Sequence, residues 1–402
     1  MSPVVLALVL IGAACAVAFW PRHGAPRRRA ADRHPPSRGW ARRVALELPA
    51  AFRRVSWGPA AGALSPTVHG DGRALDDGWR WRISTPGSVT VAEVEGKASA
   101  IASALNSRAH LVGALEISHG GHEGWAYVSA WRADPLDRER EIPWEPGEQP
   151  PCVEPGTVCL GVGRDSAHVH VPIVGRAGAM CMLSGGMRGS GKSEGMLGVV
   201  SQLVGWGWAP PVLIDTARQG MDLGVFAPVA AGPVVTTVKG ATVAVRKARA
   251  ECLRRAKILG GTYPPTRLLT EFDARVPMIP LVIDELQGPM GDPACKVELT
   301  RFAQETRAMG GSVFAATQYP TVEVVDATFR QQMGYRQAFR CMNSAEGPVI
   351  LGAVPTGTGP HLLRGGPGMC IADLDGGSLV TLRTWRVPER WLVEHVRRVS
   401  RR

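Results

Sequence analysis

The sequence has no Cys-x-x-Cys pair, although the 402-residue chain contains 8 cysteines. Their spacing suits neither a structural zinc site nor the disulfide framework of a small secreted domain. Dispersed thiols that act as small apolar residues are typical of a reducing compartment. Two histidine pairs, His119/His122 and His168/His170, have no clustered third ligand in the sequence, so neither pair predicts a metal site. No internal repeat or long low-complexity tract is present either.

Acidic residues are scarcer than basic ones, with 35 Asp and Glu against 46 Lys and Arg and a formal net charge of +11. A positive excess favours a polyanionic partner, either nucleic acid or an anionic membrane surface, and does not bear on the fold. Part of the excess is local, because the arginines between residues 22 and 43 face only Asp32 in that stretch.

Charged residues are absent from residues 3–20, an apolar run close to the length of a membrane-spanning helix. Arginines follow this run rather than precede it, which favours an anchor over the alternatives, a cleaved signal peptide or a buried helix. The positive-inside rule then predicts a single-pass protein of the cell membrane, with residues 1–20 as the anchor and the remainder cytoplasmic. Residues 21–43 predict a basic linker, either near anionic headgroups or simply solvated.

The length suggests two folded units beyond this linker. Residues 44–150 predict a small, tryptophan-rich α+β domain. Thr90 and Glu93 form a capping box for an amphipathic helix over residues 91–106, and strands are expected over 111–117 and 125–131. Residues 151–385 alternate short apolar strands with helices such as 241–259, which predicts an α/β domain with a mostly parallel sheet. Residues 386–402 predict a basic C-terminal helix that contacts phosphate or a neighbouring subunit, or is solvated.

A P-loop occupies residues 186–193, which fit the pattern G-x-x-x-x-G-K-[ST] between an apolar strand and a helix. Its backbone N–H groups are expected to face the phosphate oxygens of ATP. Lys192 is expected to reach the β and γ phosphates, and the Ser193 hydroxyl to bind Mg²⁺. The residues predicted to bind the nucleotide are therefore Gly186, Met187, Arg188, Gly189, Ser190, Gly191, Lys192 and Ser193.

Two acids follow the apolar strand at residues 280–283, at the sheet edge where open α/β sheets bind ligands. Asp284 is expected to hold Mg²⁺ through water, and Glu285 to orient or deprotonate the attacking water. The strand over residues 312–316 ends in Thr317 and Gln318, and Gln318 is predicted to sense the γ-phosphate or that water. Together these features predict an ATPase that uses ATP and Mg²⁺.

The P-loop, Val212-Leu-Ile-Asp215, the acidic strand and the segment from Arg307-Ala-Met-Gly to Thr317-Gln-Tyr-Pro320 together resemble the motor domain of the FtsK/SpoIIIE family, over residues 158–375. The resemblance implies a RecA-like P-loop NTPase that assembles as a hexameric ring and pumps double-stranded DNA. Arg336 lies in a segment similar to the family's arginine-bearing strand, which implies a trans-acting arginine at a neighbour's γ-phosphate. The alternative for Arg336 is an ordinary salt bridge.

The layout of anchor, small domain and motor is similar to that of actinomycete Tra-type conjugative transfer proteins. This implies transfer of a plasmid or integrative element and other conjugation proteins as partners. Three departures are that Asp215 is followed by Thr-Ala instead of the family's Pro-Lys, that a further family arginine aligns with Pro348, and that no winged-helix domain is expected after Asp375. A type VII secretion-like protein translocase and a slow-cycling, ATP-binding membrane scaffold are the alternative functions.

Overall fold

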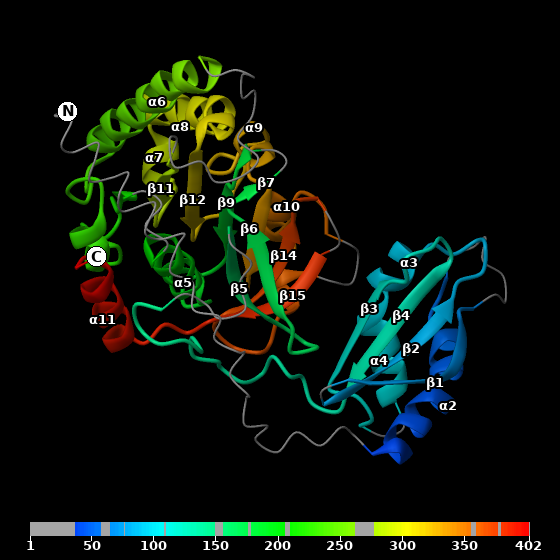
Figure 1. Cartoon of the computed structure of the whole chain (residues 1–402). Helices are drawn as coiled ribbons and strands as arrows, with labels where there is room; N and C mark the ends of the chain where they lie inside the picture. Colours follow the sequence, from blue (N-terminus) through cyan, green and yellow to red (C-terminus); the bar gives the residue numbers. More distant parts are fainter. Residues whose placement is uncertain are drawn as a thin grey trace.

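The computed structural model describes residues 37–57, 65–75, 77–107, 110–148, 156–175, 178–205, 210–261, 277–354, 359–376 and 379–401. The predicted anchor at residues 1–20 and most of the predicted linker lie outside these ranges. Among the helices that are described, none is long and apolar enough to cross a membrane. Figure 1 shows a small unit, coloured blue to cyan, beside a larger α/β unit.

The small unit is an antiparallel sheet backed by helices. Its strands, in spatial order, are β1 (Thr67–Leu75), β2 (Gly78–Ser84), β4 (Trp125–Trp131) and β3 (Ala114–His119). Apolar residues of α2 (Arg38–Arg54), α3 (Val91–Gly96) and α4 (Ala98–Asn106) pack with Trp81, Ile83 and Val128 of the sheet in one core. The strand β1 is exposed along most of its length, so the core lies on the helical side.

The structure differs from the sequence prediction at two helices of this unit. Residues 38–43, expected to belong to the linker, form the start of α2, because Ala41 and Val44 are buried in the core. The helix expected over residues 91–106 is divided at Lys97 into α3 and α4. Its predicted cap is confirmed, since the Thr90 hydroxyl accepts a hydrogen bond from the Glu93 N–H at 3.2 Å.

The larger unit is built on a nine-stranded mixed sheet. The strands β10 (Val212–Ile214), β11 (Ile279–Ile283), β12 (Gly311–Thr317), β9 (Met182–Gly185) and β13 (Tyr335–Phe339) run parallel, in that spatial order. The sheet then continues antiparallel through β14 (Met369–Leu374), β15 (Leu379–Thr384), β5 (Thr157–Gly163) and β6 (His168–Pro172). The expectation of a mostly parallel sheet is therefore wrong for one half, where short turns join β5 to β6 and β14 to β15 and require antiparallel neighbours.

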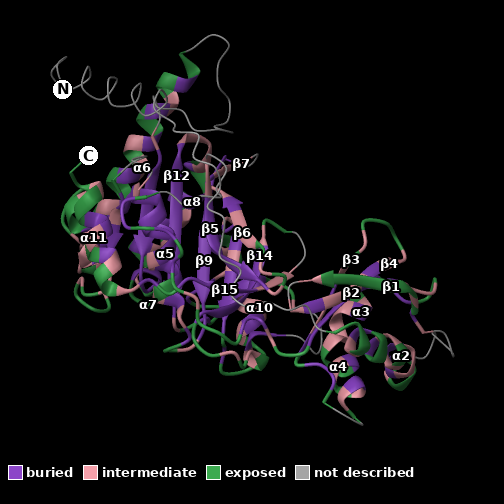
Figure 2. Ribbon diagram, turned by 60° about the horizontal axis from the view of Figure 1, so that its bottom comes forward, coloured by how far each residue is buried: buried purple, intermediate pink, exposed green. Residues whose placement is uncertain are grey.

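Helices cover both faces of this sheet, and Figure 2 shows its buried strands between helices whose outer faces are exposed. One apolar core includes residues of α6 (Val238–Gly260), α7 (Gln287–Gly291), α8 (Pro293–Glu305), α9 (Ala327–Gln331) and α10 (Glu346–Leu351). The other includes residues of α5 (Lys192–Gly205), η1 (Gly224–Val229) and α11 (Glu389–Val399). Side chains of β11 alternate between the two cores: Leu281 and Ile283 pack in the first, and Val282 packs in the second. The short elements β7 (Val174–Gly175), β8 (Gly178–Ala179), η2 (Arg307–Met309) and η3 (Pro360–Leu362) complete the unit.

The segment that leads from the small unit to the larger one packs on the larger one. Leu136, Ile142 and Trp144, expected in the small domain, contribute to the core that contains α5 and α11. Trp144 contacts Trp385 edge to face, with ring centroids 6.0 Å apart. The segment joins the α/β unit because these apolar side chains are buried there.

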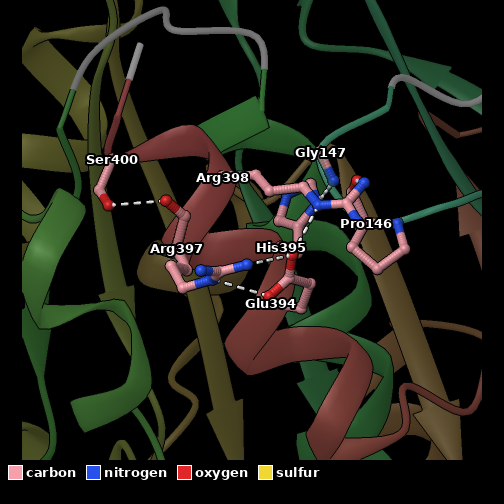
Figure 3. A network of polar contacts seen from close by, with 7 residues as sticks. All are labelled: Pro146, Gly147, Glu394, His395, Arg397, Arg398 and Ser400. Carbon is pink, nitrogen blue, oxygen red and sulfur yellow. Dashed lines mark hydrogen bonds and ion pairs between the residues drawn. The ribbon is translucent and has the colours of Figure 1, made fainter.

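The C-terminal helix α11 is anchored by a buried histidine (Figure 3). His395 accepts a hydrogen bond at Nδ1 from the Gly147 N–H, at 2.8 Å, so its Nε2 carries the proton donated to the Ser201 carbonyl, also at 2.8 Å. Arg397 and Arg398 pair with Glu394, and Arg398 also donates to the Pro146 carbonyl. The amphipathic helix expected at the C-terminus is confirmed, and these two arginines are engaged within the chain.

Candidate nucleotide-binding site

The segment between β9 and α5 adopts a tight loop that depends on glycine. Gly189 and Gly191 have φ of +74° and +96°, a left-handed region that L side chains rarely occupy. The loop is tied to neighbouring strands by N–H groups of Gly186 and Met187, which donate to the carbonyls of Thr317 at 3.3 Å and Arg340 at 2.8 Å. Residues 186–193 thus curl at the C-terminal end of the strand, where α5 begins.

A second loop, residues 365–368, lies directly against the P-loop. The Gly368 N–H donates to the Ser190 carbonyl at 2.8 Å, and a methyl group at Gly191 would lie 2.2 Å from the Gly368 nitrogen. Arg383 holds this second loop, because its buried guanidinium donates to the carbonyls of Gly365, Pro367 and Leu136. Sequence analysis missed Arg383, since no local signal marks an arginine that binds three distant carbonyls.

Two buried side chains of the P-loop, Ser190 and Lys192, offer hydrogen-bond donors that suit an anionic ligand. The buried Ser190 hydroxyl has no hydrogen-bond partner within the described chain. The Lys192 ammonium donates a hydrogen bond to the Met187 carbonyl at 2.9 Å. Burial lowers the pKa of this ammonium to about 8, although the nearby carboxylates of Glu285 and Asp284 act to raise it. The Ser190 hydroxyl can donate to a phosphate oxygen, and the Lys192 ammonium can pair with one, so the residues present suit ATP. Arg188 and Gly189 at the tip are exposed.

Asp284 follows β11 and faces the start of α5. Its Oδ1 accepts a hydrogen bond from the Ser193 hydroxyl at 3.4 Å. Burial, and then the nearby carboxylates of Asp222 and Asp215, raise the pKa of Asp284 to about 7. Crowded carboxylates beside a hydroxyl suit a hard divalent cation, so Asp284 and Ser193 would hold Mg²⁺ here.

Asp222 is a member of this cluster that sequence analysis missed. Asp215, at the end of β10, accepts hydrogen bonds from the N–H groups of Arg218 at 3.1 Å and Asp222 at 3.0 Å. These two hydrogen bonds close a turn that brings Asp222 near Asp284. Within the same turn, Asp222 forms an ion pair with Arg218 at 3.2 Å. Arg218 also lies close enough to Lys192 to depress its pKa further, so it adds positive charge near the P-loop.

Glu285 is held by the end of the adjacent strand β12. Its Oε1 accepts from the Thr317 hydroxyl at 2.9 Å, and its Oε2 from the Gln318 N–H at 2.9 Å. Gln318 therefore lies beside Glu285 as the strand order predicts, with a half-buried side chain. These contacts fix the orientation of the carboxylate, as a water-positioning or general-base role requires.

Arg336 is placed differently from the other predicted site residues. It lies on β13, level with Leu183 of β9, and pairs with Asp373 opposite it on β14. Its side chain also lines a cavity together with Glu93 and Glu95 of α3. The structure thus gathers the P-loop, Asp284, Glu285 and Gln318 at one sheet edge and gives Arg336 an intrachain partner.

A cavity of about 320 Å³ opens beside the P-loop. Gly191 and Glu194 form one side of it, and the loop at Gly368 and the segment from Thr384 to Glu389 form the other. The cavity is also lined by the indole of Trp385 and by several charged residues.

No protein-family model matches the chain. DNA translocase FtsK 1 of Neisseria meningitidis is 28% identical to it over 225 residues, which is 48% of this chain and 27% of that protein. DNA translocase SpoIIIE of Bacillus subtilis is 28% identical over 187 residues, which is 42% of this chain and 24% of that protein. The chain thus spans about a quarter of the length of these curated relatives.

Two solved structures share the fold. The pCW3 conjugation coupling protein TcpA, in a monomer form with ATPγS, has a TM-score of 0.56 and 18% identity, over 85% of this chain and 95% of that one. The cytoplasmic domain of the Thermomonospora curvata type VII secretion ATPase EccC has a TM-score of 0.51 and 21% identity, over 64% of this chain and 33% of that one. With the motifs gathered at one sheet edge, these comparisons identify the larger unit as a P-loop ATPase domain, similar in sequence to the DNA translocases FtsK and SpoIIIE.

Proposed function

We propose that the chain is a membrane-anchored, ATP-driven motor that moves double-stranded DNA in conjugative transfer. The observation that carries this proposal is that the P-loop, Asp284, Glu285 and Gln318 lie together at one sheet edge, in a domain similar in sequence to proteins named DNA translocases. Lys192 and the P-loop N–H groups would bind the phosphates of ATP, and Ser193 and Asp284 would hold Mg²⁺. When bound, Mg²⁺ neutralises charge on the β and γ phosphates.

Hydrolysis would depend on Glu285, with Gln318 beside it. The carboxylate is oriented by Thr317 and by the Gln318 backbone, which supports a role in accepting a proton from the attacking water. The neutral Gln318 side chain would position the same water. The intact set of Lys192, Asp284, Glu285 and Gln318 favours a cycling enzyme over a scaffold that only binds ATP.

Duplex DNA as the substrate is supported by the relatives and by charge. A motor that accepts every sequence binds through phosphates, and the formal net charge of +11 suits that mode. The fold likeness to a conjugation coupling protein covers 85% of this chain, which supports a role in conjugation. The fold likeness to a secretion ATPase keeps a protein substrate as the rival outcome.

The decisive experiment measures ATP turnover of the purified chain with and without duplex DNA, over a series of salt concentrations. We expect stimulation that is independent of DNA sequence and that falls steeply as salt rises, because phosphate contacts release counterions. Glu285→Gln protein corrects for contaminating ATPases. No stimulation at any salt would indicate a scaffold, and stimulation only by a secreted protein would indicate the secretion class.

Membrane anchoring by residues 1–20 is tested by fractionation. A chain lacking residues 1–36 should leave the membrane fraction and still bind ATP, because the residues removed contribute nothing to the described folded units. The cut is placed before Ser37, which caps α2, since removal of residues 37–43 would take away the start of that helix. Recovery of the shortened chain with membranes would contradict a single anchor.

A further inference from the structure

One edge of the larger sheet gathers a thiol and two imidazoles. Cys159 on β5 lies directly opposite His170 on β6, and His168 lies two residues along the same strand. The ligand atoms of these three side chains all lie within 4.8 Å of one another. None of the three is a residue of the P-loop, and all lie on the hairpin at the edge of the sheet.

Strand geometry explains why these side chains meet. Residues two apart on a strand share a face, and residues directly opposite in an antiparallel pair also share it. A β-bulge between Cys159 and Gly161 shifts the register by one residue, so that Gly161 lies opposite Val169 and Val162 opposite His168. The sequence shows only the histidine pair, because strand pairing supplies the third ligand from nine residues upstream.

An indole closes the cluster from one side. The Trp385 Nε1–H donates to the Cys159 sulfur at 3.4 Å, and the Trp385 ring meets His168 edge-on at 5.3 Å between centroids. Cys159, Trp385 and Trp144 are 1%, 4% and 5% exposed, so the sulfur lies in an apolar, nearly dry surrounding.

The backbone at Cys159 is fixed from the P-loop helix. The side-chain amide of Gln202 on α5 accepts from the Cys159 N–H at 2.8 Å and donates to the Cys159 carbonyl at 3.0 Å. Gln202 is itself buried and donates to the Gly198 carbonyl at 2.8 Å. The position of the sulfur is thus set by a strand pair on one side and a helix on the other.

We propose that Cys159, His168 and His170 form a binding site for a divalent transition-metal ion of borderline softness, such as Zn²⁺. One thiolate and two imidazoles are a ligand set that Zn²⁺ accepts, with a fourth position open to water. Bond lengths of about 2.0–2.3 Å place such ligands about 3.5 Å apart, so the three atoms approach by roughly 1 Å through side-chain rotation. As the sulfur–metal bond forms, the thiol proton passes to solvent.

The test uses the untagged 402-residue chain, treated with a chelator and then titrated with Co²⁺ and with Zn²⁺ in the absence of nucleotide. We expect one Co²⁺ per chain with a thiolate-to-metal charge-transfer band, displaced by an equimolar amount of Zn²⁺. Because only a thiolate produces that band, an ion bound by Asp284 at the nucleotide site does not imitate it. Proton release on binding, followed with a pH indicator, is a second readout.

Variants locate the site. Cys159→Ser should abolish the charge-transfer band, and His168→Gln, at a half-buried position, should weaken binding at least about tenfold. Cys252→Ser, at another buried cysteine, on α6, should bind Co²⁺ like the parent chain. ATP binding by each variant verifies that it is folded. The proposal is overturned if the parent chain shows no stoichiometric thiolate band, or if that band survives with unchanged affinity in folded His168→Gln protein.

Discussion

Glu285 is held by hydrogen bonds from Thr317 and Gln318 at the end of β12 and from the Gln287 N–H. In Glu285→Gln, the amide keeps the shape of the carboxylate and loses its basicity, so ATP binding should survive. Turnover should fall by about 10²-fold or more, the usual contribution of a positioned base. Turnover and the binding of a fluorescent ATP analogue measure the two effects.

The surface change Glu305→Gln removes an ion pair with Arg249 and serves as the matched control. It should leave both turnover and binding unchanged. Loss of ATP binding in Glu285→Gln, with normal hydrolysis per bound ATP, would contradict the assignment of a base.

Two perturbed groups in the nucleotide site predict how its properties depend on pH. The raised pKa of Asp284, about 7 against 3.8, means that the folded protein without ligand holds a proton that the unfolded chain has lost. This contribution to stability is complete at low pH and is lost as pH rises through about 7. Mg²⁺ binding requires the carboxylate, so the Mg²⁺-dependent part of ATP affinity should increase over the same interval.

Lys192 limits the other side of this profile, since its ammonium, with a pKa of about 8, loses its proton above that pH. ATP affinity in Mg²⁺ should therefore be greatest between these two values. Calorimetric titration from about pH 6 to about pH 9 would measure it. In Asp284→Asn, the acidic limb should disappear and the alkaline limb should remain. A flat profile for the parent chain would contradict both shifts.

At the scale of elements, the loop over residues 365–368 is part of the nucleotide site, although no motif marks it. Arg383→Met keeps an apolar stem and leaves buried carbonyls of Gly365, Pro367 and Leu136 without their donor. Each unpaired carbonyl costs about 1–3 kcal/mol, so the melting temperature should fall by several degrees. ATP affinity should also fall, because the contact of Gly368 with Ser190 loosens.

The neighbouring arginine provides the control for this prediction. Arg386 pairs with Glu141 on the surface, and exposed ion pairs contribute little to stability. Arg386→Met should therefore retain the melting temperature of the parent chain. Equal losses in both variants would show that Arg383 has no special part in supporting the loop.

Features set by neighbouring residues were predictable from the sequence, and features set by strand pairing were not. The P-loop, the acids after β11 and the helix α6 follow from local glycine patterns, strand ends and apolar periodicity. The antiparallel half of the sheet depends on register between segments far apart, as between Gly163 and Leu382. Asp222, Arg383 and Cys159 have clear partners only after such long-range contacts form, so periodicity and spacing could not identify them.

At the scale of the whole molecule, Arg336 tests whether active sites are shared between subunits. Its pairing with Asp373 would have to give way for it to reach a neighbour's γ-phosphate. Arg336→Ala should then bind ATP normally and hydrolyse it slowly, because transition-state charge is left unbalanced. Mixed with Lys192→Ala protein, it should regain part of the turnover at boundaries where an intact P-loop meets an intact arginine.

Each variant alone has no such boundary, so the comparison is between mixtures and single variants under the same assembly conditions. Co-assembly is verified with differently labelled chains. If mixed rings form and turnover does not rise above that of either variant, Arg336 acts within its own chain.

The place of β5 and β6 in the sheet has a consequence for synthesis of the chain on the ribosome. These strands, at residues 157–172, are the first of the large sheet to be made, yet their neighbour β15 ends at Thr384. The apolar core of the small unit is formed within residues 38–131, so this unit is able to fold early, during elongation. The hairpin of β5 and β6 instead keeps the β15-facing edge of β5 unpaired until β15 has been synthesised. Because a long loop must close before β5 and β15 can pair, this pairing forms late and slowly. Aggregation of nascent chains should accordingly be most sensitive to substitutions in this hairpin.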